Sequence, residues 1–140
     1  MKKLILLTVL FFLLFAAGGS ETANAQKKQR LNSTPKAFQI FYAKFRNAVV
    51  KGDKNRVASL TQFSFRYAVD AGDEDTFSKA QFIEKFDNIF GVERKIFAQK
   101  NPIFYSEAGT YNLTDNDDAS HFIFEKKGAS YKFTAFFGEP

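Results

Sequence analysis

The only histidine in the chain, His121, sets a first limit on its chemistry. A metal site with two histidine ligands is excluded within one chain, and the lack of cysteine excludes thiolate nucleophiles, disulfides and cysteine-ligated metals. His121 opens "HFIFE", where strand alternation places Ile123 and Glu125 on the same face as the histidine. It is interpreted either as a pocket acid, base or hydrogen-bond donor, or as a strand-end histidine at a rim.

Two acidic segments invite comparison with calcium loops. "LTDNDDASH" contains Asp115, Asp117 and Asp118, but Ala119 and Lys126 stand at positions where an EF-hand needs oxygen ligands. "DAGDEDTF" fails the same comparison. Both are interpreted as solvated turns, and neither a metal nor a cofactor is predicted.

The N-terminus has the pattern of a bacterial export signal. A basic start precedes the apolar run Leu4–Ala17, and Ala23–Ala25 has the small-x-small pattern of a cleavage site. The run is shorter than the roughly 20 residues that span a bilayer. We therefore predict a signal peptide over residues 1–25, cleaved after Ala25, and a periplasmic or secreted protein. An uncleaved membrane anchor is the alternative.

Composition predicts an aromatic core and a mildly basic surface. The 140 residues include 19 Phe and 5 Tyr but no Trp, and the formal net charge is +5. "QKKQR" begins a predicted solvated linker over residues 26–34. Acidic surfaces such as lipid headgroups or cell-wall polymers are weak partners in this interpretation. Nucleic acid is not predicted, because the sequence shows no dense basic stripe.

Helical periodicity dominates the first half of the chain. Residues 35–51 predict a helix that begins at an N-cap Thr34 and ends at Gly52. Asp53 is expected to cap a second short helix. Residues 78–91 predict a third helix with a capping box formed by Ser78 and Gln81.

The other segments have strand character. Residues 63–69 alternate as a strand, and the chain after residue 91 is expected to be all β, in "RKIFAQ", "PIFYSEAG", "TYNLT", "HFIFEKK" and "SYKFTAFF". The last two form a hairpin about Gly128. The expected fold is therefore one α+β domain over residues 35–140, with three N-terminal helices packed on a curved, mostly antiparallel sheet.

This order of elements resembles the nuclear transport factor two-like superfamily, whose cone-shaped, cystatin-like fold is shared with the ketosteroid isomerases. The resemblance rests on "FYAKFRNAVVKGDKNRVASLTQFSF", "FSKAQFIEKFDNIF" and "GASYKFTAFFGEP", and is strongest to small exported bacterial members of undescribed role. It implies that the helices and the concave sheet enclose an apolar pocket. It implies no activity, because one fold hosts many functions.

Catalytic members of that superfamily place an acidic base and a tyrosine or acid donor inside the cone. Tyr67, Tyr105 and His121 are the candidate ligand-binding residues here, but no Asp or Glu is embedded in an apolar strand, where desolvation would raise its pKa. We therefore expect a binding domain for a small apolar ligand, without catalytic residues. The alternatives are an isomerase or hydratase that uses Tyr67, His121 and a carboxylate, and a protein-interaction module that dimerises through its sheet.

Overall fold

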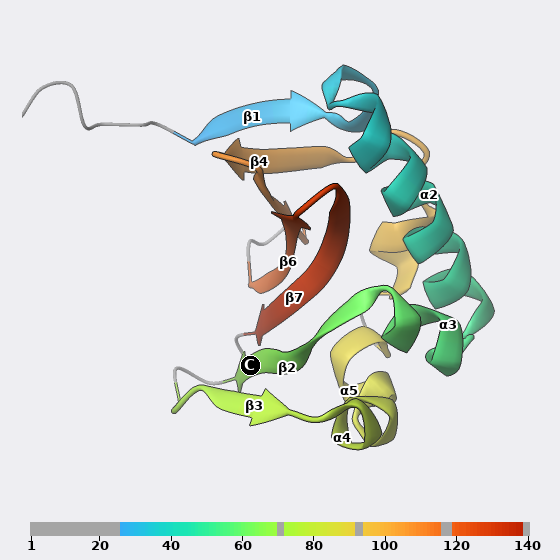
Figure 1. The fold of residues 1–140 in the computed structure, drawn as a ribbon, viewed down its shortest axis with the longest axis vertical. Helices are drawn as coiled ribbons and strands as arrows, with labels where there is room; N and C mark the ends of the chain where they lie inside the picture. The colour runs from blue at the N-terminus through green and yellow to red at the C-terminus, as the bar shows by residue number, and fades with distance from the viewer. Residues whose placement is uncertain (1–25, 70–71, 92–93, 116–118, 139–140) are drawn as a thin grey trace, which may run out of the picture.

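A twisted sheet with helices on one face makes up the fold (Figure 1). The computed structural model describes residues 26–69, 72–91, 94–115 and 119–138. In these residues the strands are β1 (Lys27–Arg30), β2 (Thr61–Val69), β3 (Asp75–Phe77), β4 (Ile103–Glu107), β5 (Thr110–Thr114), β6 (Ser120–Lys127) and β7 (Ser130–Gly138). The α-helices are α2 (Lys36–Lys51), α3 (Lys54–Ser59), α4 (Lys79–Glu84) and α5 (Phe86–Phe90), and the 3-10 helices are η1 (Leu31–Ser33) and η2 (Arg94–Ala98).

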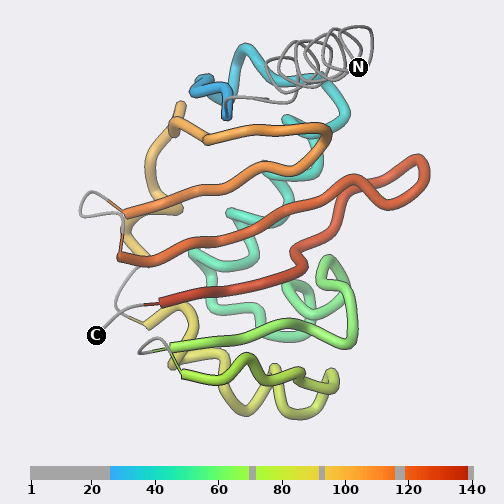
Figure 2. Tube along the Cα trace, turned by 90° about the vertical axis from the view of Figure 1, so that its left-hand side faces the viewer, coloured from blue at the N-terminus to red at the C-terminus, as the bar shows by residue number. Residues whose placement is uncertain are grey.

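The sheet order is β1-β4-β5-β6-β7-β2-β3. All neighbours pair antiparallel except β2 and β7, which are parallel. α2 runs along one side of the molecule, and Figure 2 views the strands from the opposite side, with the helices behind them. The sheet therefore has an inner face toward the helices and an outer face turned away from them.

The expected α+β class and the curved, mostly antiparallel sheet are confirmed, but the helices do not all precede the strands. β1, β2 and β3 come before α4 in the chain. The predicted third helix is divided at Lys85, whose ψ of 6° departs from helical geometry, into α4 and α5. Of the expected strands, "RKIFAQ" is instead the 3-10 helix η2, which buries the consecutive residues Ile96 and Phe97. Two adjacent buried side chains do not fit strand alternation over one buried face.

Two segments expected to be loops contribute strands instead. The predicted linker, residues 26–34, contains β1, which pairs with β4. The acidic segment after β2 contains β3, which pairs with β2 so that Phe77 lies opposite Phe65. Both are edge strands, and their short polar sequences carry little of the hydrophobic alternation by which strands are predicted.

The predicted corner between the first two helices is confirmed. Gly52 has a φ of 70°, and the Asp53 carboxylate accepts a hydrogen bond from the backbone N–H of Arg56 at 3.0 Å. The predicted N-cap of α2 is wrong, because Pro35 holds that position and the Thr34 hydroxyl donates to the carbonyl of Leu31 at 2.6 Å. The capping box at the start of α4 is present as predicted.

Aromatic side chains from both layers form the core between the helices and the inner face. The aromatic core predicted from composition is present, and from the sequence we expect six of its phenylalanines to be largely buried. All six are buried: Phe41, Phe45, Phe82, Phe86, Phe124 and Phe133. None of the helices in the described part of the chain is long and apolar enough to cross a bilayer. The predicted signal peptide lies outside that part, so cleavage and export stay predictions.

Candidate functional site on the outer face of the sheet

The predicted aromatic lining beneath the sheet is present, and the rings contact one another. The ring centroid of Phe45 on α2 lies 5.1 Å from that of Phe124 and 5.0 Å from that of Phe133. The rings of Phe38 and Tyr111 stack at 4.0 Å. In this structure the chain's own side chains occupy the space that a ligand would take in an open cone.

One polar atom in this interior lacks a partner. Tyr42 is fully buried, and its hydroxyl finds no hydrogen-bond partner among the described residues. Burial raises the pKa of Tyr42 far above its ordinary value, and the nearby Arg46 guanidinium opposes that shift. The hydroxyl is thus kept protonated and is no candidate for a base.

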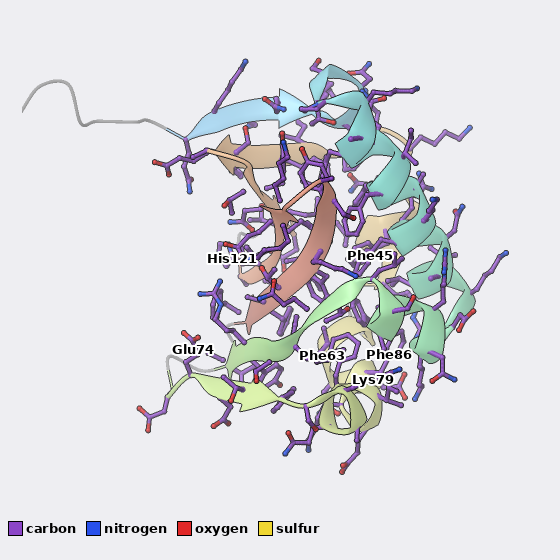
Figure 3. The ribbon with its side chains drawn as sticks, in the orientation of Figure 1. Phe45, Phe63, Glu74, Lys79, Phe86 and His121 are labelled. Carbon is purple, nitrogen blue, oxygen red and sulfur yellow. The ribbon has the colours of Figure 1, made fainter. Side chains whose placement is uncertain are left out.

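The polar side chains of the central strands gather on the outer face instead. In the register of the sheet, Tyr105 on β4 lies opposite Asn112 on β5, and Asn112 lies opposite Ile123 on β6. His121 lies two residues before Ile123 on the same face and opposite Thr114. Figure 3 shows His121 and Phe45 on opposite sides of the sheet. We call Tyr105, Asn112, His121 and Ile123 the outer-face site.

Asn112 and His121 are joined by a hydrogen bond. Asn112 Nδ2 lies 3.0 Å from His121 Nδ1. With the amide as donor, the histidine accepts at Nδ1 and carries its proton at Nε2. Asn112 Oδ1 is then buried without a partner among the described residues. A buried carbonyl without a donor is costly, so a ligand N–H or O–H that reaches it after a small rearrangement would gain a strong contact.

Two depressions adjoin these residues and share Tyr105. One, of about 370 Å³, is lined in part by Lys28, Arg30 and Thr114. The other, of about 320 Å³, is lined in part by Asn112 and Ile123. The Lys28 ammonium lies 5.8 Å from the centroid of the Tyr105 ring, so a cation already lies over that ring.

Charged groups border the site toward β7 and β2. Glu125 contacts Arg66 at 3.9 Å and Lys127 at 3.8 Å, and the Arg66 guanidinium lies 5.7 Å from the ring centroid of Phe137. Glu125 is therefore paired with cations at a partly exposed position. This environment does not provide the desolvated carboxylate that a general base of the isomerase type requires.

The structure brings two of the three predicted ligand-binding residues to one face. Tyr105 and His121 both lie on the outer face, on either side of β5. Tyr67 lies on the inner face, where its ring stacks on Phe77 at 4.7 Å and on Phe136 at 5.8 Å. A site combining Tyr67 with His121 is therefore not formed, because the two side chains point to opposite faces of the sheet.

The predicted absence of a metal site remains a prediction. Asp117 and Asp118 lie outside the described residues, and Asp115 accepts a hydrogen bond from the Ala119 N–H at 2.8 Å. Among the residues described, no three His, Asp or Glu side chains are grouped closely enough to hold a metal ion.

Asn112, the central residue of the outer-face site, is not among the residues predicted from the sequence. Its signal was available in "TYNLT", where alternation sets Asn112 on the face opposite to Tyr111 and Leu113. What the sequence could not supply was the register, which places it between Tyr105 and Ile123 and within reach of His121.

Comparisons with known proteins find similar structures but no similar sequence. No protein-family model matches the chain, and no curated protein matches it. A solved structure from Xanthomonas campestris, provisionally described as a calcium/calmodulin-dependent protein kinase II association domain, is 14% identical; the match covers 81% of this chain and 93% of that chain, with a TM-score of 0.41.

Two further structures are similar to the same degree. An NTF2-like protein with a cystatin-like fold from Novosphingobium aromaticivorans is 12% identical, over 74% of this chain and 79% of that chain, with a TM-score of 0.39. LinA is 14% identical, over 72% of this chain and 81% of that chain, with a TM-score of 0.40. The superfamily named from the sequence thus occurs among the similar structures.

Proposed function

We propose that this chain is a non-enzymatic binding domain that holds a small hydrogen-bonding ligand at the outer-face site. The observation that carries the proposal is the pair of Asn112 and His121 beside Tyr105, with a buried amide oxygen that has no partner in the described part of the chain. The ligand expected there has a ring or apolar edge for Tyr105 and Ile123 and a donor for the amide oxygen.

An apolar ligand in the interior is less well supported by the packing. Phe45, Phe124 and Phe133 are each 0% exposed, and a ligand between them would have to displace at least one ring. Protein interiors are close-packed, and forced expansion of a core typically costs about 1–3 kcal/mol. Two depressions already adjoin the outer-face site, so a ligand there requires only the small rearrangement at Asn112 and no expansion of the core.

Catalysis has less support than binding. His121 is held by an amide rather than by a carboxylate, and the nearest paired acid on its strand face, Glu125, contacts two cations. These groups therefore do not form the close pair of a buried acid and a base that isomerases and hydratases use. Turnover is therefore not part of the proposal.

The test is two-dimensional amide NMR of the chain from Gln26 onward, with phenol, benzamide and methyl glucoside as separate probes. We expect saturable shifts at β4, β5 and β6 for at least one probe, with the affinity reduced about tenfold or more by Asn112→Ala. Asn88→Ala is the matched control, because Asn88 is exposed on α5, on the other side of the molecule.

Three results would overturn the proposal. Shifts confined to the core residues of α2 and the inner face would show that the ligand binds in the interior. If none of the probes caused saturable shifts, the proposed role in binding a small ligand would be contradicted. Shifts that depend on protein concentration rather than on probe would show that a second copy of the chain covers this face.

A further inference from the structure

The solvent-facing side of α2 carries a stripe of lysines and exposed aliphatic side chains. Helical spacing puts on this side Lys36, Ile40, Ala43, Lys44, Asn47, Val50 and Lys51, which we call the α2 stripe. All of them are exposed. Ile40 and Val50, with exposed fractions of 49% and 47%, are among the few large apolar residues in the described part of the chain that are exposed. The opposite side of the helix is buried in the core.

No acidic residue offsets this charge within the helix. α2 contains no Asp or Glu, and the sequence from Gln26 to Gly52 contains none either. The three lysines of the stripe form no ion pair with any residue that the structure describes. Their positive charge is therefore available to a partner.

The elements packed against α2 add cations rather than anions. α3 follows directly with Lys54 and Arg56, and η2 carries Arg94 and Lys95. Asp53, between the two helices, is used as the cap of α3. The carboxylate on α5, Asp87, contacts Lys54 at 3.1 Å and Arg94 at 3.4 Å.

We propose that the α2 stripe docks this domain on an anionic lipid surface. The lysines would contact lipid headgroups, and Ile40 and Val50 would enter the boundary between headgroups and acyl chains. In Figure 1, α2 lies at the right-hand edge of the molecule, with the strands to its left. Contact along this helix leaves the outer face of the sheet, on the opposite side, open to solvent.

The exposed aliphatic residues favour a lipid surface over a soluble polyanion. A nucleic acid or an acidic polysaccharide would use the cations alone, because its affinity comes from neutralising charge. Ile40 and Val50 lie on the same side as the lysines and gain stability only where an apolar phase is within reach. The two kinds of side chain together match an interfacial helix.

The experiment is co-sedimentation of the chain from Gln26 onward, which excludes the apolar N-terminal run, with two vesicle types. One is pure phosphatidylcholine, and the other contains equal parts of phosphatidylcholine and phosphatidylglycerol. We expect binding only to the anionic vesicles, weakened on the order of 100-fold in the triple variant Lys36→Gln, Lys44→Gln, Lys51→Gln. Ile40→Ser with Val50→Ser should weaken it several-fold at the same salt concentration.

The control variant Lys79→Gln, Lys85→Gln, Lys126→Gln removes the same charge from exposed positions outside α2. It should keep most of the binding, and circular dichroism should show that every variant is folded. An equal loss of vesicle binding in both triple variants would show that binding depends only on the net charge of the protein, and it would overturn the proposal. Unchanged binding after the Ile40 and Val50 substitutions would also overturn it, because these side chains would then not enter the lipid. A preference for a heparin column over vesicles would overturn it by showing that the partner is a soluble polyanion.

Discussion

The two faces of the sheet differ in what their side chains do. On the inner face, Phe124 and Phe133 meet Phe45 from α2, and nearly every ring is fully buried. On the outer face, Tyr105 and His121 are half-buried and surround Asn112. Both faces are made by the same strands, because successive side chains alternate between them.

This difference separates stability from binding. On the inner face the aromatic rings contact one another, and these contacts stabilise the fold. The outer face carries polar groups and adjoins two depressions. In our account, substitutions on the inner face change stability, whereas substitutions on the outer face change binding.

The largest expected effect is on the inner face. Truncation of a fully buried phenylalanine removes ring contacts and leaves a cavity, so Phe45→Ala should lower the free energy of unfolding by about 3–5 kcal/mol. Urea denaturation of the folded chain measures it. A loss below about 0.5 kcal/mol would mean that the rings around Phe45 are not closely packed.

An intermediate effect of opposite sign is expected at Tyr42. Its hydroxyl is buried without a partner in the described residues, so Tyr42→Phe should raise the free energy of unfolding by about 1 kcal/mol. A decrease of similar size would show that the hydroxyl has a partner, such as an ordered water molecule, and that the interior holds polar space.

The pH dependence of the same variant gives a second measurement. Burial raises the pKa of Tyr42 above the unfolded value of 10.0, so above that pH the unfolded state loses a proton that the native state keeps. Stability should therefore fall as the pH rises above about 10, and it should fall less steeply in Tyr42→Phe. Equal slopes for the two proteins would contradict the burial of this hydroxyl.

The smallest effect on stability is expected on the outer face. Asn112→Ala removes one side-chain hydrogen bond, which lowers the free energy of unfolding, and one unpartnered buried oxygen, which raises it. We expect the free energy of unfolding to change by less than about 0.5 kcal/mol. A loss of 2 kcal/mol or more, measured in urea, would make the Asn112–His121 pair a structural element.

Much of the inner face could be predicted from the sequence. The phenylalanine spacing in residues 35–51 and 78–91 identified the buried sides of α2, α4 and α5, because a periodic apolar pattern has only one stable orientation. The corner at Gly52 was predictable because a glycine followed by a capping aspartate is a local signal.

The outer face could be predicted only in part. Tyr105 and His121 were chosen for their chemistry, but the sequence could not say which face each side chain would occupy, and Tyr67 proved to lie on the other one. Which strands are neighbours, and in what register, depends on long-range pairing that local patterns do not encode. For the same reason the edge strands β1 and β3 were missed.

Xenon binding tests most directly whether the interior is filled. Xenon enters empty apolar cavities, so crystals of the chain pressurised with xenon would show bound atoms wherever such a cavity exists. We predict no xenon among Phe38, Phe45, Phe124 and Phe133, which are all fully buried, because the ring of Phe124 contacts each of the other three. Ordered xenon between α2 and the inner face would contradict this account and would favour a ligand site in the interior of the cone.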